Sequence, residues 1–174
     1  AYEGSLYLVK LGHTNILYVE YRRPDLPAVV ADRFVGFKKA LDEHRVSFSA
    51  DQRITVDFMD LKELRARLKS AFARQKKPTA VFAHDDYIAA YVMEALKELG
   101  LSVPEDVSII APGDVLDYSQ PYVPQITTMR INTSMMGKLA CQLFLDLLKD
   151  DTGEIHVLKV KQQLIKRASC RRIR

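Results

Sequence analysis

Residues 79–111, TAVFAHDDYIAAYVMEALKELGLSVPEDVSIIA, contain the pattern that decides the fold. A short apolar run over 79–83 is followed by a segment in which apolar residues recur every three or four positions, and Gly100 stands where this helix should end. A second apolar run over 106–111 completes a strand–helix–strand unit. Such a unit joins two parallel strands by a right-handed crossover. The segment therefore predicts an α/β fold with an open parallel sheet and flanking helices on both faces.

The alternation of strand and helix patterns continues on both sides of this unit. Before it, the sequence predicts a helix over 3–12, a strand over 16–19, a helix with Asp32 as its N-cap, a strand over 54–58 and a helix capped by Asp60. After it, the sequence predicts an extended segment over 127–132, a long helix over 133–149 and an extended segment over 156–166. The wide apolar stripe of the 133–149 helix requires a partner surface, and we expect the Met135-Met136 pair to pack in a core.

Composition and charge exclude several classes of protein. Hydrophobic residues make up 48% and charged residues 28% of the 174 residues, which is typical of a globular domain. No apolar run reaches the roughly 18 residues of a membrane span, so we expect no membrane partner. The net charge of +4 comes from a basic segment after His156, which we interpret as a solvated tail, with a phosphate-contacting arm as the alternative. The two cysteines suit the cytoplasm, and the missing initiator Met suggests a fragment of a longer protein.

Polar residues at the ends of the predicted strands are the candidate binding residues. Ligands of open α/β sheets bind beyond the carboxyl ends of the strands. Carboxylates accept hydrogen bonds from hydroxyl groups, a guanidinium donates in a planar fork, and an aromatic ring covers the apolar face of a sugar. The residues that fit these roles are Tyr21, Arg33, Asp85, Asp86, Tyr87 and Asp114. One of the two acids at 85 and 86 is equally suited to capping the helix that follows.

The sequence offers no positive sign of catalysis, a cofactor or a metal site. His84 stands beside two aspartates, but the other histidines lie at spacings that do not make an HxH or HxxxH pair. Nucleophile-elbow, phosphate-loop and dinucleotide-binding motifs are also missing. We therefore expect neither a cofactor nor an enzyme, although a small α/β enzyme with Asp85 or Asp86 as general base is an alternative.

Several motifs in one order along the chain resemble the effector-binding domain of LacI/GalR-type transcriptional repressors, which has a fold of the type I periplasmic-binding-protein kind. The motifs are Arg33-Phe34-Val35-Gly36-Phe37, Pro78 to Ala83 with Asp86 and Ala89, Leu99-Gly100-Leu101, Val103 to Ile110, Thr127-Thr128-Met129, Gly137 to Ala140 and Arg167 to Cys170. The resemblance implies that residues 1–130 form mainly the C-terminal lobe, that 131–155 belong to the mostly missing N-terminal lobe, and that 156–174 are a return strand and basic tail.

The resemblance also implies a function. A small sugar would bind in a cleft between two lobes, with Arg33 at the position of the family's sugar-binding arginine. A homodimer would then control operator DNA through a LacI-type or GntR-type domain that this chain lacks. Asp85 replaces the family's usual Asn and Gly113 replaces a usual carboxylate, which suggests an altered sugar, such as the pentose arabinose. The alternative of the same fold is a periplasmic sugar-binding protein of a transporter.

Overall fold

A six-stranded sheet forms the centre of the computed structural model, which describes residues 1–22, 29–57, 60–149 and 157–173. Within these residues the strand order is β2-β1-β3-β4-β5-β6. The strands are β1 (Ile16–Arg22), β2 (Arg53–Asp57), β3 (Ala80–Ala83), β4 (Ser108–Gly113), β5 (Thr127–Arg130) and β6 (Gln163–Ile165). The strand–helix–strand unit lies at the centre, where β3 pairs with β1 and β4 in parallel. The predicted fold class is confirmed.

Strand β6 departs from the predicted parallel sheet, because it pairs with β5 in the antiparallel sense. The register joins Thr128 to Ile165 and Arg130 to Gln163. The chain leaves the sheet at the end of β5, continues into helix α5 and re-enters the sheet from the same edge. A strand that begins beside the end of its neighbour must run in the opposite direction, so the return fixes the orientation of β6.

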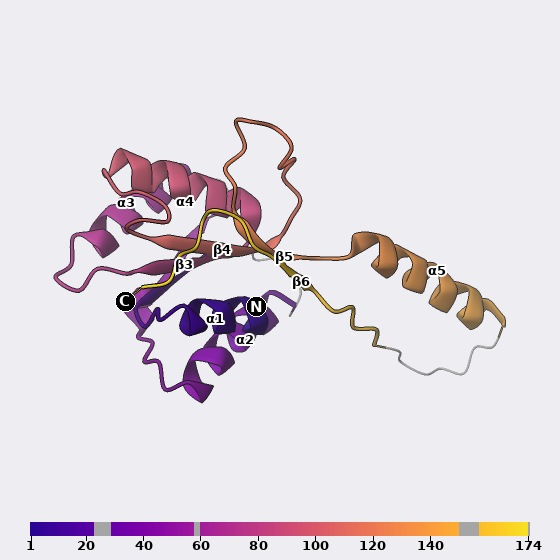
Figure 1. Cartoon of the computed structure of the whole chain (residues 1–174). Coiled ribbons are helices and arrows are strands. Elements are labelled where there is room, and N and C mark those ends of the chain that lie inside the picture. Colours follow the sequence, from indigo (N-terminus) through magenta and orange to yellow (C-terminus); the bar gives the residue numbers. More distant parts are fainter. Residues whose placement is uncertain (23–28, 58–59, 150–156, 174) are drawn as a thin grey trace.

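Four helices cover the two faces of the sheet in the described part of the chain (Figure 1). Helices α1 (Tyr2–Lys10) and α2 (Val29–Glu43) pack on one face, where Tyr18, Phe37 and Phe82 form an aromatic core. Helices α3 (Leu61–Phe72) and α4 (Asp86–Glu98) cover the other face. A short 3₁₀ turn, Ala50–Gln52, precedes β2. The covered faces explain why the central strands are buried throughout.

The helix ends show which local signals were decisive. Asp60 caps α3 as predicted, because its Oδ1 accepts the backbone N–H of Glu63 at 2.9 Å. Gly100 ends α4 with a φ of +74°, and the N–H of Leu101 bonds to the carbonyl of Leu96 at 2.9 Å. The predicted N-cap at Asp32 is wrong, since α2 already begins at Val29 and Asp32 lies in its first turn. A carboxylate is favourable at either place, near the positive end of the helix dipole.

Helix α5 (Thr133–Lys149) has the predicted bounds but stands away from the sheet (Figure 1). None of its residues is buried, and Met135 and Met136 are 44% and 49% exposed, so their predicted core packing is wrong within the described residues. A helix with such a stripe is typical of one whose packing partner is another surface. Among the described helices, none has both the length and the apolar character needed to cross a bilayer.

Two phenylalanine substitutions test this division between core and free helix. Phe82→Ala removes a ring buried between Tyr18 and Phe37, so we expect the free energy of unfolding to fall by about 3–5 kcal/mol. Phe144→Ala makes the same change on α5, where the ring is 61% exposed, and should cost less than about 0.5 kcal/mol. Urea unfolding of the two variants measures both values. Similar losses in both would show that α5 packs on the domain.

Candidate functional site

The carboxyl ends of β1, β3 and β4 meet at one edge of the sheet, next to the beginnings of α2 and α4. Arg33, early in α2, reaches this edge. Its Nη1 atom lies 2.9 Å from the Nε2 atom of His84 and also donates to the backbone carbonyl of His84 at 2.9 Å. His84 follows directly after β3. The structure therefore brings the predicted arginine to the strand end that carries the predicted acids.

Asp85 is the acid that caps α4. Its backbone is extended, with a φ of −151°, and its Oδ1 accepts the N–H of Ile88 at 2.8 Å. Burial raises the pKa of the Asp85 carboxyl, and the nearby charge of Asp86 adds to this effect. The hydrogen bond from Ile88 and the positive charge of Arg33 act on the same pKa in the opposite direction. Asp85 thus caps α4 at the strand end where Arg33 meets His84.

Asp86 has a different position, with a carboxylate that is completely buried. Its Oδ2 atom accepts hydrogen bonds from the N–H groups of Val115 at 2.6 Å and Leu116 at 2.9 Å, and from the hydroxyl of Tyr118 at 3.2 Å. A Cβ atom on Gly113 would lie 2.6 Å from Oδ1 of Asp86, and Gly113 has a φ of +130°. Asp86 therefore anchors the loop after β4, and it fits only because position 113 has no side chain.

Asp114 follows β4 and faces the neighbouring strand β5. Its carboxylate accepts from Thr128 Oγ1 at 2.6 Å, from Arg130 Nε at 2.5 Å and from Arg167 Nη2 at 2.7 Å. The guanidinium of Arg167 also lies over the ring of Tyr118, 3.6 Å from its centroid. Burial alone would raise the pKa of Asp114, but the hydrogen bonds from Thr128, Arg130 and Arg167 outweigh it and lower that pKa. Asp114 joins β4 to β5 and to the segment after β6.

The two predicted tyrosines differ in exposure. Tyr21 is 6% exposed and belongs to the core under α3 and α4, with its ring centroid 6.2 Å from that of His84. Tyr87 is half exposed on the first turn of α4. The hydrogen bonds of Arg33 go to His84, a strand-end residue that is not among the six predicted to bind the effector. The part of the chain that the structure describes holds no cluster of three or more metal-ligating side chains.

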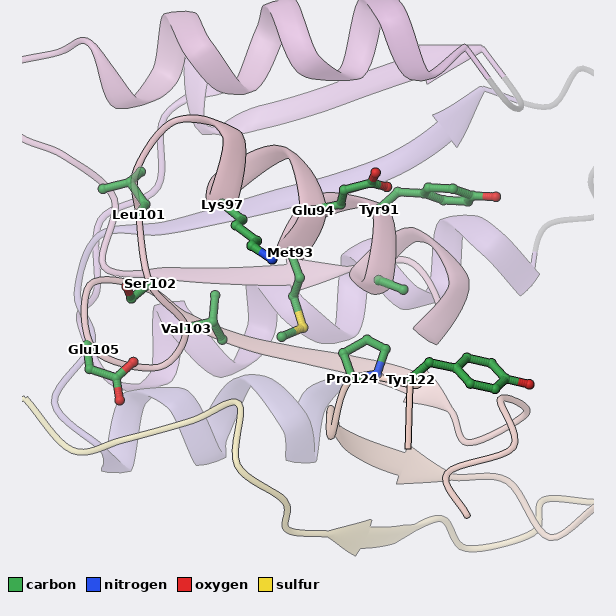
Figure 2. A pocket seen from close by; sticks show the side chains of 11 residues that line it. Tyr91, Met93, Glu94, Lys97, Leu101, Ser102, Val103, Glu105, Tyr122 and Pro124 are labelled. Atoms are coloured by element: carbon green, nitrogen blue, oxygen red, sulfur yellow. The ribbon is translucent and has the colours of Figure 1, made fainter. Parts of the chain in front are cut away.

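A second feature is a hollow of about 690 Å³ along α4 (Figure 2). It lies between the outer face of α4, the turn after this helix and the loop that precedes β5. Its lining combines apolar groups with charged ones, notably Met93, Val103, Tyr122, Pro124, Glu94 and Lys97. Tyr122 is 80% exposed. None of the six residues predicted for the effector site lines this hollow, so it is a separate surface.

The sheet, with polar side chains beyond the carboxyl ends of its parallel strands, has the arrangement of ligand-binding proteins of the periplasmic-binding-protein type. Residues 6–170 match the family of periplasmic binding protein-like domains, and the chain belongs to this family. The resemblance to the effector-binding domains of LacI-type regulators is confirmed.

The relatives are transcription regulators. The HTH-type transcriptional repressor PurR of Vibrio vulnificus is 29% identical over 172 residues, which are 99% of this chain and 50% of the relative. The chain thus spans about half the length of the curated relatives it matches. A LacI-type transcriptional regulator from Bacillus cereus subsp. cytotoxis matches with a TM-score of 0.84 and 27% identity, over 99% of this chain and 60% of that one. A LacI family regulator from Enterococcus faecium with bound ribose matches with a TM-score of 0.78 and 27% identity, over 99% and 62%.

The lowered pKa of Asp114 predicts a pH-dependent contribution to stability. A depressed carboxyl pKa stabilises the fold above the unfolded value of about 3.9, and this contribution disappears as the pH falls through the lower folded value. Asp114→Asn should therefore lower the free energy of unfolding by about 1–3 kcal/mol at pH 7, and by progressively less below about pH 4. Urea unfolding between pH 3 and pH 7 measures this difference.

Asp146→Asn is the matched control. Asp146 lies on α5 and accepts hydrogen bonds only from Gln142 among the described residues. The same substitution there should leave stability unchanged at each pH. A constant loss in Asp114→Asn across the whole pH range would contradict the role assigned to the ion pairs.

Proposed function

We propose that this chain is the larger part of the sugar-binding C-terminal lobe of a LacI-type transcriptional regulator. The observation that carries the proposal is the pair of contacts from Arg33 to His84 at the carboxyl edge of the sheet, directly before the residue that caps α4, Asp85. A guanidinium and a carboxylate from the same edge of the sheet supply both hydrogen-bond donors and acceptors to a polyol. In this proposal Arg33, Asp85 and Tyr87 contact the effector, whereas Asp86, Asp114 and Tyr21 support them from within the fold.

The effector class we propose is a pentose, with arabinose as the first candidate. Ribose is bound to the Enterococcus faecium regulator, which shares this fold at 27% identity. Position 113 cannot hold the carboxylate that is usual in the family, because Asp86 occupies the space that a side chain there would need. The hydrogen-bond acceptors at this site therefore differ from the usual ones, which supports a sugar with a different pattern of hydroxyls. A purine base is the competing effector class.

The second lobe is proposed to cover α5. The apolar side chains of this helix are exposed, notably Phe144, Leu145 and Leu148, and the matched curated regulators are about twice as long as this chain. Burying such a stripe against the rest of a two-lobed domain would gain roughly 25 cal/mol for each Å² of apolar surface. Residues 131–155 then belong to the second lobe, and the segment from 156 returns to the first.

A homodimer through the α4 face is the partner we propose for the hollow in Figure 2. The exposed ring of Tyr122 and the side chains of Met93 and Val103 give this hollow an apolar character. Glu94 and Lys97 are exposed and lie one turn apart on α4. With a two-fold axis perpendicular to α4, the two copies of the helix would run antiparallel, and Lys97 of one copy would face Glu94 of the other. Such an arrangement would make the surface complementary to itself.

The regulatory mechanism we propose is a shift between open and closed forms of this dimer. An effector favours the closed form only as far as it binds that form more tightly, and coupling of about 1–3 kcal/mol is usual. A DNA-binding domain elsewhere in the full protein would read the difference at operator DNA in the cytoplasm. The HTH-type repressor among the relatives supports this mechanism.

Removing the Arg33 side chain tests the effector site. In a protein with both lobes, we expect Arg33→Ala to weaken binding of the preferred sugar by roughly 10- to 100-fold, since hydrogen bonds from a charged donor are lost. Calorimetry with arabinose, ribose and a purine base measures the affinities. Lys39→Ala, an exposed change on the same helix, is the matched control and should have no effect. Equal losses in both variants, or a purine as the tightest ligand, would contradict the proposal.

The dimer is tested by sedimentation of the chain. Tyr122→Glu places a charge in the lining of the hollow along α4 and should shift the protein from dimer to monomer. Val35→Glu introduces the same charge at an exposed site on α2, on the opposite face of the sheet, and should leave the dimer intact. A wild-type monomer would favour the periplasmic transporter component. Association that persists in Tyr122→Glu would place the interface elsewhere.

A further inference from the structure

His84 is the only protein residue, in the part of the chain that the structure describes, that accepts a hydrogen bond from the side chain of Arg33. Both contacts come from one atom of the guanidinium. Nη1 meets the ring nitrogen Nε2 at 2.9 Å and the backbone carbonyl oxygen at 2.9 Å. Nη1 has two hydrogens, so these two acceptors use its donor capacity completely.

The ring that accepts from Arg33 is itself held in place. The backbone N–H of His84 continues the β1–β3 ladder by donating to the carbonyl of Val19 at 2.8 Å. The side chain is 7% exposed, and the ring of Tyr21 lies beside it. A buried ring on a paired strand has little freedom to turn. His84 can therefore define a direction for a longer and more flexible arginine side chain.

We propose that His84 is a positioning residue, which fixes the Arg33 guanidinium so that its Nε–Nη2 edge faces the ligand. This inference rests on the proposed function, because it describes how the same site selects its effector. The remaining edge carries parallel N–H groups, which match two oxygen atoms on neighbouring carbons or on one carboxylate. Among neutral ligands, the edge selects a sugar with two adjacent hydroxyls in reach of Arg33.

The geometry also determines the protonation of the imidazole. Arginine only donates hydrogen bonds, so Nε2 of His84 must be the acceptor and cannot carry the ring proton. The neutral ring then has its proton on Nδ1. This assignment depends on Arg33 and His84 alone, and it is therefore measurable in the chain without any effector.

Two substitutions at position 84 separate positioning from packing. His84→Leu fills the same space with an apolar side chain and removes the Nε2 acceptor, whereas the backbone carbonyl at position 84 can still accept from Arg33. His84→Gln retains an acceptor oxygen on a side chain of comparable length. In a protein with both lobes, we expect His84→Leu to weaken binding of the preferred sugar about tenfold, and His84→Gln to restore affinity to within about threefold of wild type.

A double-mutant cycle shows whether His84 acts through Arg33. In the Arg33→Ala background, His84→Leu should cause no further loss of affinity. Independent, additive losses would overturn the proposal, and so would equal affinities of His84→Leu and wild type. Deoxy analogues of the preferred sugar that lack one of two adjacent hydroxyls should bind more weakly than the parent to wild type. This difference should be much smaller in Arg33→Ala.

Nitrogen NMR of the ligand-free chain keeps the proposal testable if no sugar binds. The spectrum should show Nε2 of His84 unprotonated and Nδ1 protonated, and the side-chain N–H signals of Arg33 should broaden in His84→Leu but not in His84→Gln. A proton on Nε2, or unchanged Arg33 signals in His84→Leu, would overturn the positioning role. If the spectra show the expected His84 tautomer and Arg33 signals but no sugar binds, the positioning role stands and the proposed effector class is contradicted.

Discussion

The buried carboxylate of Asp86 is the constraint on which the edge of the sheet depends. A charge without access to water is costly unless hydrogen bonds compensate it, and here two backbone N–H groups and the Tyr118 hydroxyl all donate to one of its oxygens, Oδ2. These donors all belong to the loop after β4, so the carboxylate holds that loop against the beginning of α4. The same contact explains the glycine at 113, since its backbone conformation and the nearby Oδ1 atom leave no room for a side chain.

Three consecutive residues at this edge have different structural roles. His84 continues the pairing of β3 and faces Arg33, Asp85 caps the next helix, and Asp86 supports the neighbouring loop. Successive side chains at the end of a strand point in different directions, so these three are separated in space although they are adjacent in sequence. Supporting contacts of this kind hold binding groups in place, and ligand sites depend on them as much as on the groups that touch the ligand.

Sequence reasoning reached the fold because the strongest local signals agreed with one another. The apolar spacing of α4 and α5, the cap at Asp60 and the left-handed Gly100 all depend on neighbours within a few residues. The direction of β6 and the contacts of Asp114 depend on residues far along the chain, and no local pattern encodes them. The roles of His84 and Asp86 were missed for the same reason: a list of polar residues does not reveal which neighbour each one faces. Only the position of His84 at a strand end pointed toward the site.

The free helix α5 has a consequence for the life of the chain in a cell. Its exposed leucine, methionine and phenylalanine side chains form an apolar surface of the kind that molecular chaperones bind on incompletely folded or unassembled proteins. As long as nothing covers this surface, quality-control proteases would compete with assembly for the chain. Covering α5 would therefore act as a checkpoint for maturation, which only correctly assembled molecules pass.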